Sequence, residues 1–310
     1  MKRAEPPTLR EVMRAVEREL AEAGVESPGV ETQRLLSAAL RIDRPRLALE
    51  AGNPLPAEVA PRLARFLQRR LAGEPLQHIE GTAAFRSLDL GADPRALIPR
   101  PETEQLIDFV KRWSADRASG SGPVRVVPRP DAVRESPVRN ALDIGTGSGA
   151  IALSLAAENI AVQVVGVDSS EAALEQAGEN VRRAGLELRV ELRKTGPNPF
   201  AALGASERFD VIVSNPPYVR DDELADLPVE IREFEPVEAL SGGADGLGVI
   251  RRIAEQAAGF LEPDGCLWLE IGSGQAAEVQ SIFLETGTWG HIQVHRDLAG
   301  RSRFISAVPR

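Results

Sequence analysis

The chain has 310 residues, of which 43% are hydrophobic and 27% are charged, enough for two globular domains with filled cores. The formal net charge of −9 argues against a protein that binds nucleic acid through a broad basic face. Cys266 is the single cysteine, which excludes an intramolecular disulfide and a cluster of thiolate metal ligands. No run of about 18 apolar residues predicts a transmembrane helix, and residues 1–10 lack the apolar core of a signal peptide. We therefore expect a cytoplasmic protein without a metal site.

The first part of the chain, residues 8–72, has the apolar spacing of helices and no strand pattern. Thr8 and Glu11 form a capping-box pattern, which predicts a helix that begins directly after Thr8. Similar helical spacing recurs over residues 31–40 and 57–71. The sequence therefore predicts a small bundle of four or five helices.

The pattern changes over residues 81–100, where short apolar stretches alternate around Gly and Pro, as in a β-hairpin that links two domains. Pro101 suits the first turn of a helix, which we expect to continue to about Trp113. Residues 114–138 are rich in Gly, Ser, Pro and Arg and predict a flexible insertion.

From residue 140 onward, apolar strands alternate with amphipathic helices. Strands are expected at 141–144, 162–167, 188–192, 211–214, 266–271, 291–294 and 304–308, and helices at 150–158, 170–184, 249–261 and 275–284. This alternation predicts an α/β fold with a Rossmann-like, mainly parallel sheet and helices on both faces. The last two strands have no helix between them, so one strand should be antiparallel. The expected domains are 1–80 (helical), 81–100 (hairpin linker) and 101–310 (α/β).

A glycine-rich run, Asp143-Ile-Gly-Thr-Gly-Ser-Gly149, follows the first strand of the α/β domain and opens a helix. Its glycines allow a tight turn and close approach to a ligand, toward which the helix N–H groups point. The spacing differs from that of dinucleotide sites. Asp168 ends the next strand, where an acid can accept hydrogen bonds from both ribose hydroxyls of a nucleoside. A nucleoside cofactor is the favoured interpretation, and a capped glycine-rich turn is the alternative.

A second motif, Asn215-Pro216-Pro217-Tyr218, ends an apolar strand at the edge of the sheet where ligands bind in open α/β folds. The two prolines fix φ and remove two donors, leaving carbonyl acceptors beside the Asn215 side-chain oxygen. Such acceptors can hold an –NH₂ group by both hydrogens and aim its lone pair at a methyl group. Tyr218, the only tyrosine, can wall the pocket and stack on a planar amide. The alternative is a strand that two prolines simply stop.

These two motifs carry a first resemblance. The glycine run resembles the first motif of class I S-adenosylmethionine-dependent methyltransferases, and the Asn-Pro-Pro-Tyr tetrad resembles that of amino methyltransferases acting on adenine, cytosine, guanine or glutamine nitrogen. The tetrad alone therefore leaves nucleic-acid and protein substrates open.

Longer motifs over nearly the whole chain resemble the peptide chain release factor glutamine methyltransferases, the HemK/PrmC family. They are Gly73-Glu-Pro-Leu-Gln-His-Ile-Glu-Gly81, Leu97-Ile-Pro-Arg-Pro-Glu-Thr-Glu104, Glu235-Pro-Val-Glu-Ala-Leu240, Asp245-Gly-Leu247, Leu269-Glu-Ile-Gly-Ser-Gly-Gln275 and Asp297-Leu-Ala-Gly-Arg301. The resemblance implies methyl transfer from S-adenosylmethionine to the N5 amide nitrogen of the glutamine in the Gly-Gly-Gln motif of release factors. It also implies that the helical domain recognises that protein substrate.

The resemblance further implies roles for individual residues. The cofactor would be bound by Gly145, Thr146, Gly147, Ser148, Gly149, Asp168 and Asn215. The glutamine amide would be bound by Asn215, Pro216, Pro217 and Tyr218, with Arg100, Thr103 and Glu104 near the mouth of the site. A well-capped helix start is the alternative for residues 100–104.

The sequence departs from the family pattern in three places: at Arg86, at residues 198–200 beside the expected adenine site, and in the long insertion. A structural role is favoured for His78, which lies in the linker, and for Cys266, which lies in an apolar strand. Two other functions stay open: a nucleic-acid amino methyltransferase with the same tetrad, and a non-catalytic protein that kept the cofactor pocket. We expect a monomer whose partners are release factors, with no direct contact with nucleic acid or membrane.

Overall fold

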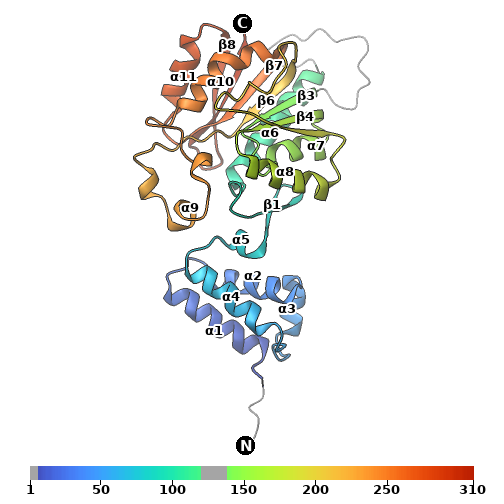
Figure 1. Cartoon of the computed structure of the whole chain (residues 1–310), viewed down its shortest axis with the longest axis vertical. Coiled ribbons are helices and arrows are strands. Elements are labelled where there is room, and N and C mark those ends of the chain that lie inside the picture. The colour runs from blue at the N-terminus through green and yellow to red at the C-terminus, as the bar shows by residue number, and fades with distance from the viewer. Residues whose placement is uncertain (1–5, 120–137) are drawn as a thin grey trace, which may run out of the picture. The chain divides into compact units, whose positions relative to one another are not determined.

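The computed structural model describes residues 6–119 and 138–310, which separate into two compact units (Figure 1). The helical unit contains the chain up to Gly81 together with the distant segment Pro228–Phe234. The sheet unit contains Thr82–Leu227 and Glu235–Arg310. The first boundary falls beside the expected one at residue 80, whereas the segment Pro228–Phe234 was expected within the α/β domain.

The helical unit is a bundle, as predicted from its apolar spacing. Its helices are α1 (Leu9–Glu22), α2 (Pro28–Leu40), α3 (Arg44–Glu50), α4 (Ala60–Leu71), α5 (Leu76–Glu80) and, from the distant segment, α9 (Val229–Arg232). The expected capping box is present: the Glu11 amide donates to Thr8 Oγ1 at 3.3 Å and the Thr8 amide donates to Glu11 Oε2 at 2.8 Å. Leu20, Leu35 and Leu36 are fully buried in the core between the helices.

A buried arginine explains why the distant segment belongs to the helical unit. Arg70 on α4 is only 7% exposed and pairs with Glu31 of α2 at 2.5 Å and with Glu230 of α9 at 2.6 Å. A Cβ atom on Gly73 would stand 3.1 Å from a methyl group of Val229, so the Val229 side chain packs closely against the backbone there. A helix as short as α9 has no readable periodicity, so this contact could not be predicted from the sequence.

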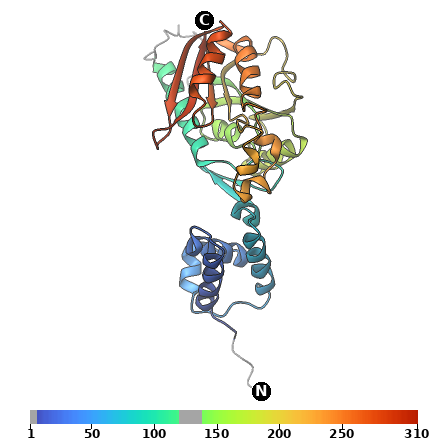
Figure 2. The ribbon, with the colours of Figure 1, turned by 90° about the vertical axis from the view of Figure 1, so that its left-hand side faces the viewer.

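The sheet unit is built on seven strands in the order β5-β4-β3-β6-β7-β9-β8. They are β3 (Val138–Ile144), β4 (Ala161–Asp168), β5 (Val190–Lys194), β6 (Phe209–Ser214), β7 (Leu261–Glu270), β8 (Trp289–Arg296) and β9 (Ser302–Pro309). Of these seven strands, β9 alone runs opposite to the rest, since it pairs antiparallel with both β7 and β8. This confirms the predicted α/β sheet with one antiparallel strand. Figure 2 shows the C-terminal strands, in red, at one edge of the sheet.

Helices cover both faces of this sheet. They are α6 (Pro101–Ser119), α7 (Ala150–Ala157), α8 (Glu171–Ala184), α10 (Gly248–Gln256) and α11 (Ala276–Glu285), with short 3₁₀ turns η1 (Leu224–Asp226), η2 (Val237–Ala239) and η3 (Ala257–Phe260). One core cluster joins the sheet to α6, α7 and α8, and a second joins it to α10 and α11. The two groups lie on opposite sides of the strands (Figure 1).

A β-hairpin, β1 (Thr82–Phe85) with β2 (Leu88–Gly91), lies where residues 81–100 predicted one, and it packs within the sheet unit. Arg86 begins its turn in the left-handed region, at φ 54°. The Arg86 guanidinium pairs with Asp108 at 2.7 Å and with Glu158. These contacts with α6 and the end of α7 give the departure from the family pattern a local structural role.

Helix α6 is longer than expected. It continues to Ser119, so residues 114–119, which were expected in the flexible insertion, are helical. Arg117 stabilises this last turn, because it pairs with Asp210 at 3.1 Å and lies over the Trp113 ring at 5.4 Å. The rest of the expected insertion, from residue 120 to 137, lies outside the described residues.

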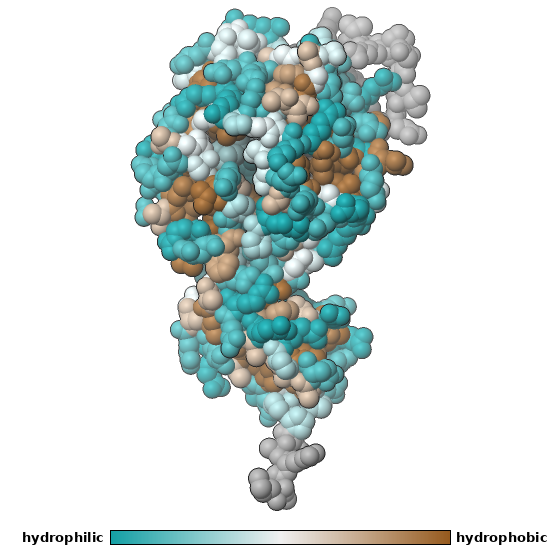
Figure 3. Space-filling model, viewed as in Figure 1, coloured by the Kyte–Doolittle hydropathy of each residue, from teal (hydrophilic) through white to brown (hydrophobic). Residues whose placement is uncertain are grey.

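In the described ranges no helix combines the length and apolar character needed to cross a membrane. Hydrophilic and apolar residues are interspersed over the face seen in Figure 3.

Candidate functional site

Most of the predicted site residues meet at one edge of the sheet, where parallel strands end together. Ile144 at the end of β3 stands opposite both Val167 of β4 and Ser214 of β6, and Ser214 stands opposite Leu269 of β7. The glycine run, Asp168, the tetrad and the end of β7 therefore share the carboxyl edge, which is the ligand-binding edge of open α/β sheets.

The glycine run forms a tight loop between β3 and α7. Gly145, Gly147 and Gly149 all have positive φ, at 69°, 55° and 84°, so side chains at these positions would strain the backbone. The amides of Gly145 and Thr146 donate to the Val167 carbonyl at 2.9 and 3.0 Å, which fixes the loop to β4. The turn that these glycines predicted is present.

Two carboxylates hold this loop. Asp168 Oδ2 accepts from the Gly147 amide at 2.8 Å and Oδ1 accepts from the Ser170 amide at 2.9 Å. Burial raises the pKa of Asp168 above its ordinary value, although these backbone bonds oppose the rise. Asp168 therefore links the glycine loop to the start of α8.

Asp143 is fully buried beneath the loop. Its Oδ2 accepts from Thr146 Oγ1 at 2.7 Å and from the Ala152 amide at 3.1 Å. Burial raises the pKa of Asp143 to about 7. Its Oδ1 has no hydrogen-bond partner among the described residues, so it is a buried acceptor available to a ligand. Asp143 belongs to the glycine-rich motif, but its position in the sequence alone predicted no role for it.

The tetrad is held at both ends by side chains from other elements. Asn215 Nδ2 donates to Thr103 Oγ1 at 3.1 Å. Arg303 donates to the Tyr218 hydroxyl at 2.7 Å, with its guanidinium 5.1 Å from the centre of the Tyr218 ring. Gln275 Nε2 donates to the Tyr218 carbonyl at 2.9 Å. The pKa of Tyr218 is raised, chiefly by burial, so its hydroxyl stays protonated near neutral pH.

Glu270, the last residue of β7, connects these two ends. It is fully buried, and its carboxylate accepts from Thr103 Oγ1 at 2.7 Å and from Arg303 at 3.3 Å. Burial raises its pKa, while the bonds from Thr103 and Arg303 oppose the rise. Neither Glu270 nor Arg303 was predicted as a site residue from the sequence. The signal that was available is a lone carboxylate at the carboxyl end of an apolar central strand.

Two glycines let the backbone close around Tyr218. A Cβ atom on Gly246 would stand 2.5 Å from the Tyr218 carbonyl oxygen, and one on Gly272 would stand 2.6 Å from Gln275 Oε1. A side chain at Gly246 would displace Tyr218, and one at Gly272 would displace the Gln275 side chain that holds Tyr218. Both glycines lie in the motifs that resemble the HemK/PrmC family, but their close approach to Tyr218 is visible only in the structure.

Of the residues expected near the mouth, the structure brings Thr103 to the tetrad. Arg100 pairs with the buried Glu235 at 2.6 Å, and its charge acts on Tyr218. The Glu104 carboxylate instead accepts from the Arg86 amide at 3.0 Å, so it holds the hairpin turn and not the tetrad cluster.

Other singled-out residues lie elsewhere. Phe200 is buried and stacks on Phe260 with ring centroids 5.1 Å apart. His78 is buried in the helical unit. Cys266 is buried in β7, and burial raises the pKa of its thiol.

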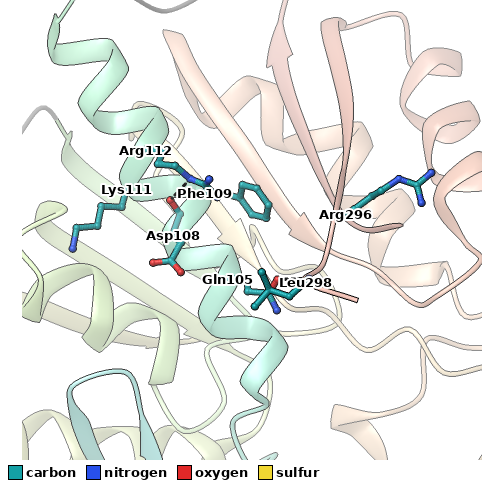
Figure 4. A pocket seen from close by; sticks show the side chains of 7 residues that line it. All are labelled: Gln105, Asp108, Phe109, Lys111, Arg112, Arg296 and Leu298. Atoms are coloured by element: carbon teal, nitrogen blue, oxygen red, sulfur yellow. Dashed lines mark hydrogen bonds between the residues drawn. The ribbon is translucent and has the colours of Figure 1, made fainter. Parts of the chain in front are cut away.

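A surface hollow of about 570 Å³ lies beside α6 and contains none of the predicted site residues. It is lined by Gln105, Asp108, Phe109, Lys111, Arg112, Arg296 and Leu298 (Figure 4).

Comparisons with known proteins match both units. A family model described as PrmC N-terminal domain matches residues 11–81, and one described as Methyltransferase small domain matches residues 131–230. The first range lies in the helical unit, and the second contains the glycine loop and the tetrad.

Curated relatives extend the similarity over nearly the full chain. The protein of Geobacter sulfurreducens named Release factor glutamine methyltransferase is 41% identical, covering 90% of this chain and 89% of the relative. Proteins of the same name from Moorella thermoacetica (39%; 98% and 99%) and Cereibacter sphaeroides (38%; 96% and 97%) are similar over still longer stretches.

Among solved structures, the hMettl16 catalytic domain in complex with MAT2A 3′UTR hairpin 1 has a TM-score of 0.53, covering 81% of this chain and 79% of that one. The identity is 16%, so this similarity concerns the fold alone.

Proposed function

Because this chain belongs to the release factor glutamine methyltransferase family, we propose that it methylates the N5 side-chain amide nitrogen of the glutamine in the Gly-Gly-Gln motif of peptide chain release factors. It is an S-adenosylmethionine-dependent enzyme. One observation at the site supports the assignment above the others. Asn215 is bound through its amide nitrogen, so its side-chain oxygen stays available to accept from the –NH₂ group of a substrate.

The residues at the glycine loop fit S-adenosylmethionine, which supplies an electrophilic methyl group when bound. Asp168, at the end of β4, can accept hydrogen bonds from the ribose hydroxyls. The glycines from Gly145 to Gly149 let the cofactor approach the backbone closely. The orphaned Asp143 Oδ1 is a buried acceptor suited to a cationic ammonium group. The pKa of Asp143 is about 7 when no ligand is bound. A bound cation would lower this pKa and so favour the ionised carboxylate.

The tetrad would act by holding and orienting the substrate amide. An amide nitrogen is a poor nucleophile, because its lone pair is delocalised into the carbonyl group. Asn215 Oδ1 and the carbonyls next to Pro216 and Pro217 would accept both hydrogens of the –NH₂ group, fixing the direction of the lone pair. Tyr218 would form a wall against the planar amide. After transfer, the methylated nitrogen loses its extra proton readily to water, so a strong base is not needed.

Arg100 and Glu104 have different proposed parts in substrate binding. The Arg100 side chain, whose charge acts on Tyr218, is a candidate for direct contact with the substrate loop. Glu104 would contribute through the hairpin turn that it holds at Arg86.

We also propose that the helical unit recognises the body of the release factor, and that the enzyme acts in the cytoplasm as a monomer. Direct action on nucleic acid is not favoured: the relatives at 38–41% identity are named as glutamine methyltransferases, while the RNA-bound neighbour shares 16% identity. The net charge of −9 also disfavours binding to a phosphate backbone.

A methyl-transfer assay tests this function. The purified protein and methyl-labelled S-adenosylmethionine would be incubated with an unmodified release factor, or with the same factor carrying Asn in place of the loop Gln. Label on the first factor and not on the second is the expected result. Label on neither, with transfer to ribosomal RNA or DNA instead, would overturn the proposal.

A further inference from the structure

We propose that Thr103 and Glu270 are positioning residues that fix which way round the Asn215 amide stands, so that its oxygen and not its nitrogen meets the substrate. The proposal rests on the proposed function, since it concerns the same –NH₂ acceptor. It adds Glu270, which lies buried behind the tetrad and, through Thr103, sets the orientation of the Asn215 amide.

The direction of the hydrogen bonds follows from what each group can donate. An ionised carboxylate only accepts, so Glu270 Oε2 requires the Thr103 hydroxyl as donor at 2.7 Å. Thr103 has a single hydroxyl hydrogen, and its oxygen must therefore accept in the 3.1 Å contact with Asn215. Only the –NH₂ end of the Asn215 amide can donate there, which leaves Oδ1 on the other side. The order Glu270, Thr103, Asn215 thus has one allowed polarity.

Arg303 favours the ionised form of Glu270, which this order of hydrogen bonds requires. A guanidinium only donates, and Arg303 donates to Glu270 Oε1 at 3.3 Å, which favours the ionised carboxylate against the effect of burial. The same guanidinium donates to the Tyr218 hydroxyl at 2.7 Å. Both ends of the tetrad are thereby connected to one buried carboxylate.

The burial of these groups argues for a role in the site and not for a contribution to stability. Glu270 is 0% exposed and Thr103 is 4% exposed. Burying a carboxylate is costly, and well-packed apolar residues usually stabilise a core as well or better. In such surroundings a hydrogen-bond chain is strong and does not exchange with water, as a preorganised site requires.

The fixed polarity gives the site a preference for –NH₂ over a carboxylate. With Oδ1 of Asn215 facing the substrate, a glutamine amide can donate, whereas the oxygens of a glutamate side chain would be repelled. If the Asn215 amide turned over, its –NH₂ group would occupy the place where the substrate amide must donate, and binding in the reactive orientation would fail.

The first arm of the test observes Asn215 directly and needs no substrate. The chain has six asparagines, so the NMR spectrum of protein labelled with ¹⁵N-asparagine contains few signals. Each signal can be assigned by substituting one asparagine at a time. We expect the Asn215 –NH₂ hydrogen that is bonded to Thr103 to exchange slowly with water in the wild type and in Thr103→Ser, and quickly in Thr103→Val. In Glu270→Gln it loses this protection in part, because the introduced side-chain amide can donate to Thr103. The Asn180 amide, which donates to the Ser148 carbonyl at 2.9 Å, is the internal control.

The second arm measures methyl transfer with the full-length protein and a release factor. Thr103→Val and Glu270→Gln should lower kcat by about 10–100-fold, as expected for a misplaced reacting group, with the dissociation constant of S-adenosylmethionine changed less than about twofold. Thr103→Ser should recover most of the rate lost in Thr103→Val. In the Thr103→Val background, Glu270→Gln should cost several-fold less than in the wild type, because its path to Asn215 is already broken.

The two arms separate the two proposals. Protected Asn215 hydrogens in a protein that methylates no release factor would refute the proposed function and leave the positioning role standing. Full exchange of these hydrogens in the wild type, or wild-type kcat in Thr103→Val, would refute the positioning role. Multiplicative losses in the double variant would also refute it, since Glu270 would then act independently of Thr103.

Discussion

The two halves of the candidate site are built in different ways. The cofactor side is local: the glycine loop lies within one strand-turn-helix segment, and its one distant partner, Asp168, ends the adjacent strand. The amide side is assembled from α6, β6, β7 and β9, whose contributing residues Thr103, Asn215, Glu270 and Arg303 are far apart in the sequence. A local site can be recognised from spacing, whereas an assembled one shows only its most unusual member in the sequence.

The largest effect is expected on the amide side. Asn215→Ala removes the proposed acceptor for the substrate amide and should lower kcat by about 10²–10³-fold, the loss typical of one group of a preorganised site. The melting temperature should change little, because Asn215 is not part of the apolar core. Initial rates with a release factor and a thermal melt of the same preparation check this. A variant that keeps more than a tenth of the wild-type kcat would remove Asn215 from the proposed chemistry.

Asp168→Asn tests the cofactor side. The substitution keeps the shape of the side chain but replaces one acceptor of the loop amides with a donor, and it removes the charge proposed for ribose binding. Loss of a charged hydrogen bond should weaken S-adenosylmethionine binding by about 10–100-fold. Calorimetric titration gives the dissociation constant, and kcat at saturating cofactor should fall far less. Equal losses in affinity and kcat would show that the two sides are not separable.

Gly246→Ala sharpens the comparison, because it disturbs the amide side through the backbone alone. The new Cβ would stand 2.5 Å from the Tyr218 carbonyl oxygen, so kcat should fall by about 10-fold as Tyr218 shifts. Gly243→Ala is the matched control: it has a similar positive φ, 92° against 75°, but nothing lies within 4 Å of the added carbon. Similar rate losses in both variants would assign the effect to backbone strain and not to the tetrad.

The alternation of strands and helices was enough to predict the sheet, its single antiparallel strand and the edge at which the site lies. The motif also indicated Asn215 and Tyr218, because the four residues of the tetrad occur together at the carboxyl end of a buried strand. Glu270 and Arg303 were missed, since a single charged residue in a strand has no meaning until its partners are placed beside it. The end of α6 was misjudged for the same reason: the partner of Arg117 is Asp210, on a distant strand.

Asp143 provides the smallest effect and a test on the cofactor side without any ligand. Its pKa is raised from 3.8 to about 7 by burial, so the folded protein holds this proton after the unfolded chain has lost it. The free energy of unfolding should therefore fall as pH rises from about 4 to about 7, by about 1 kcal/mol between pH 6 and 8. Asp143→Asn removes this slope while its Oδ1 can still accept from Thr146 and Ala152.

Urea unfolding at pH 6 and at pH 8 measures that slope. All three tryptophans lie in the sheet unit, so their fluorescence reports on the unit that contains Asp143. Other titrating groups change both proteins alike, and the difference between wild type and Asp143→Asn isolates the buried carboxyl group. An identical pH dependence in the two proteins would mean that Asp143 is ionised in the folded state throughout. The orphaned Oδ1 would then be a permanently charged acceptor, ready for a cation before any ligand arrives.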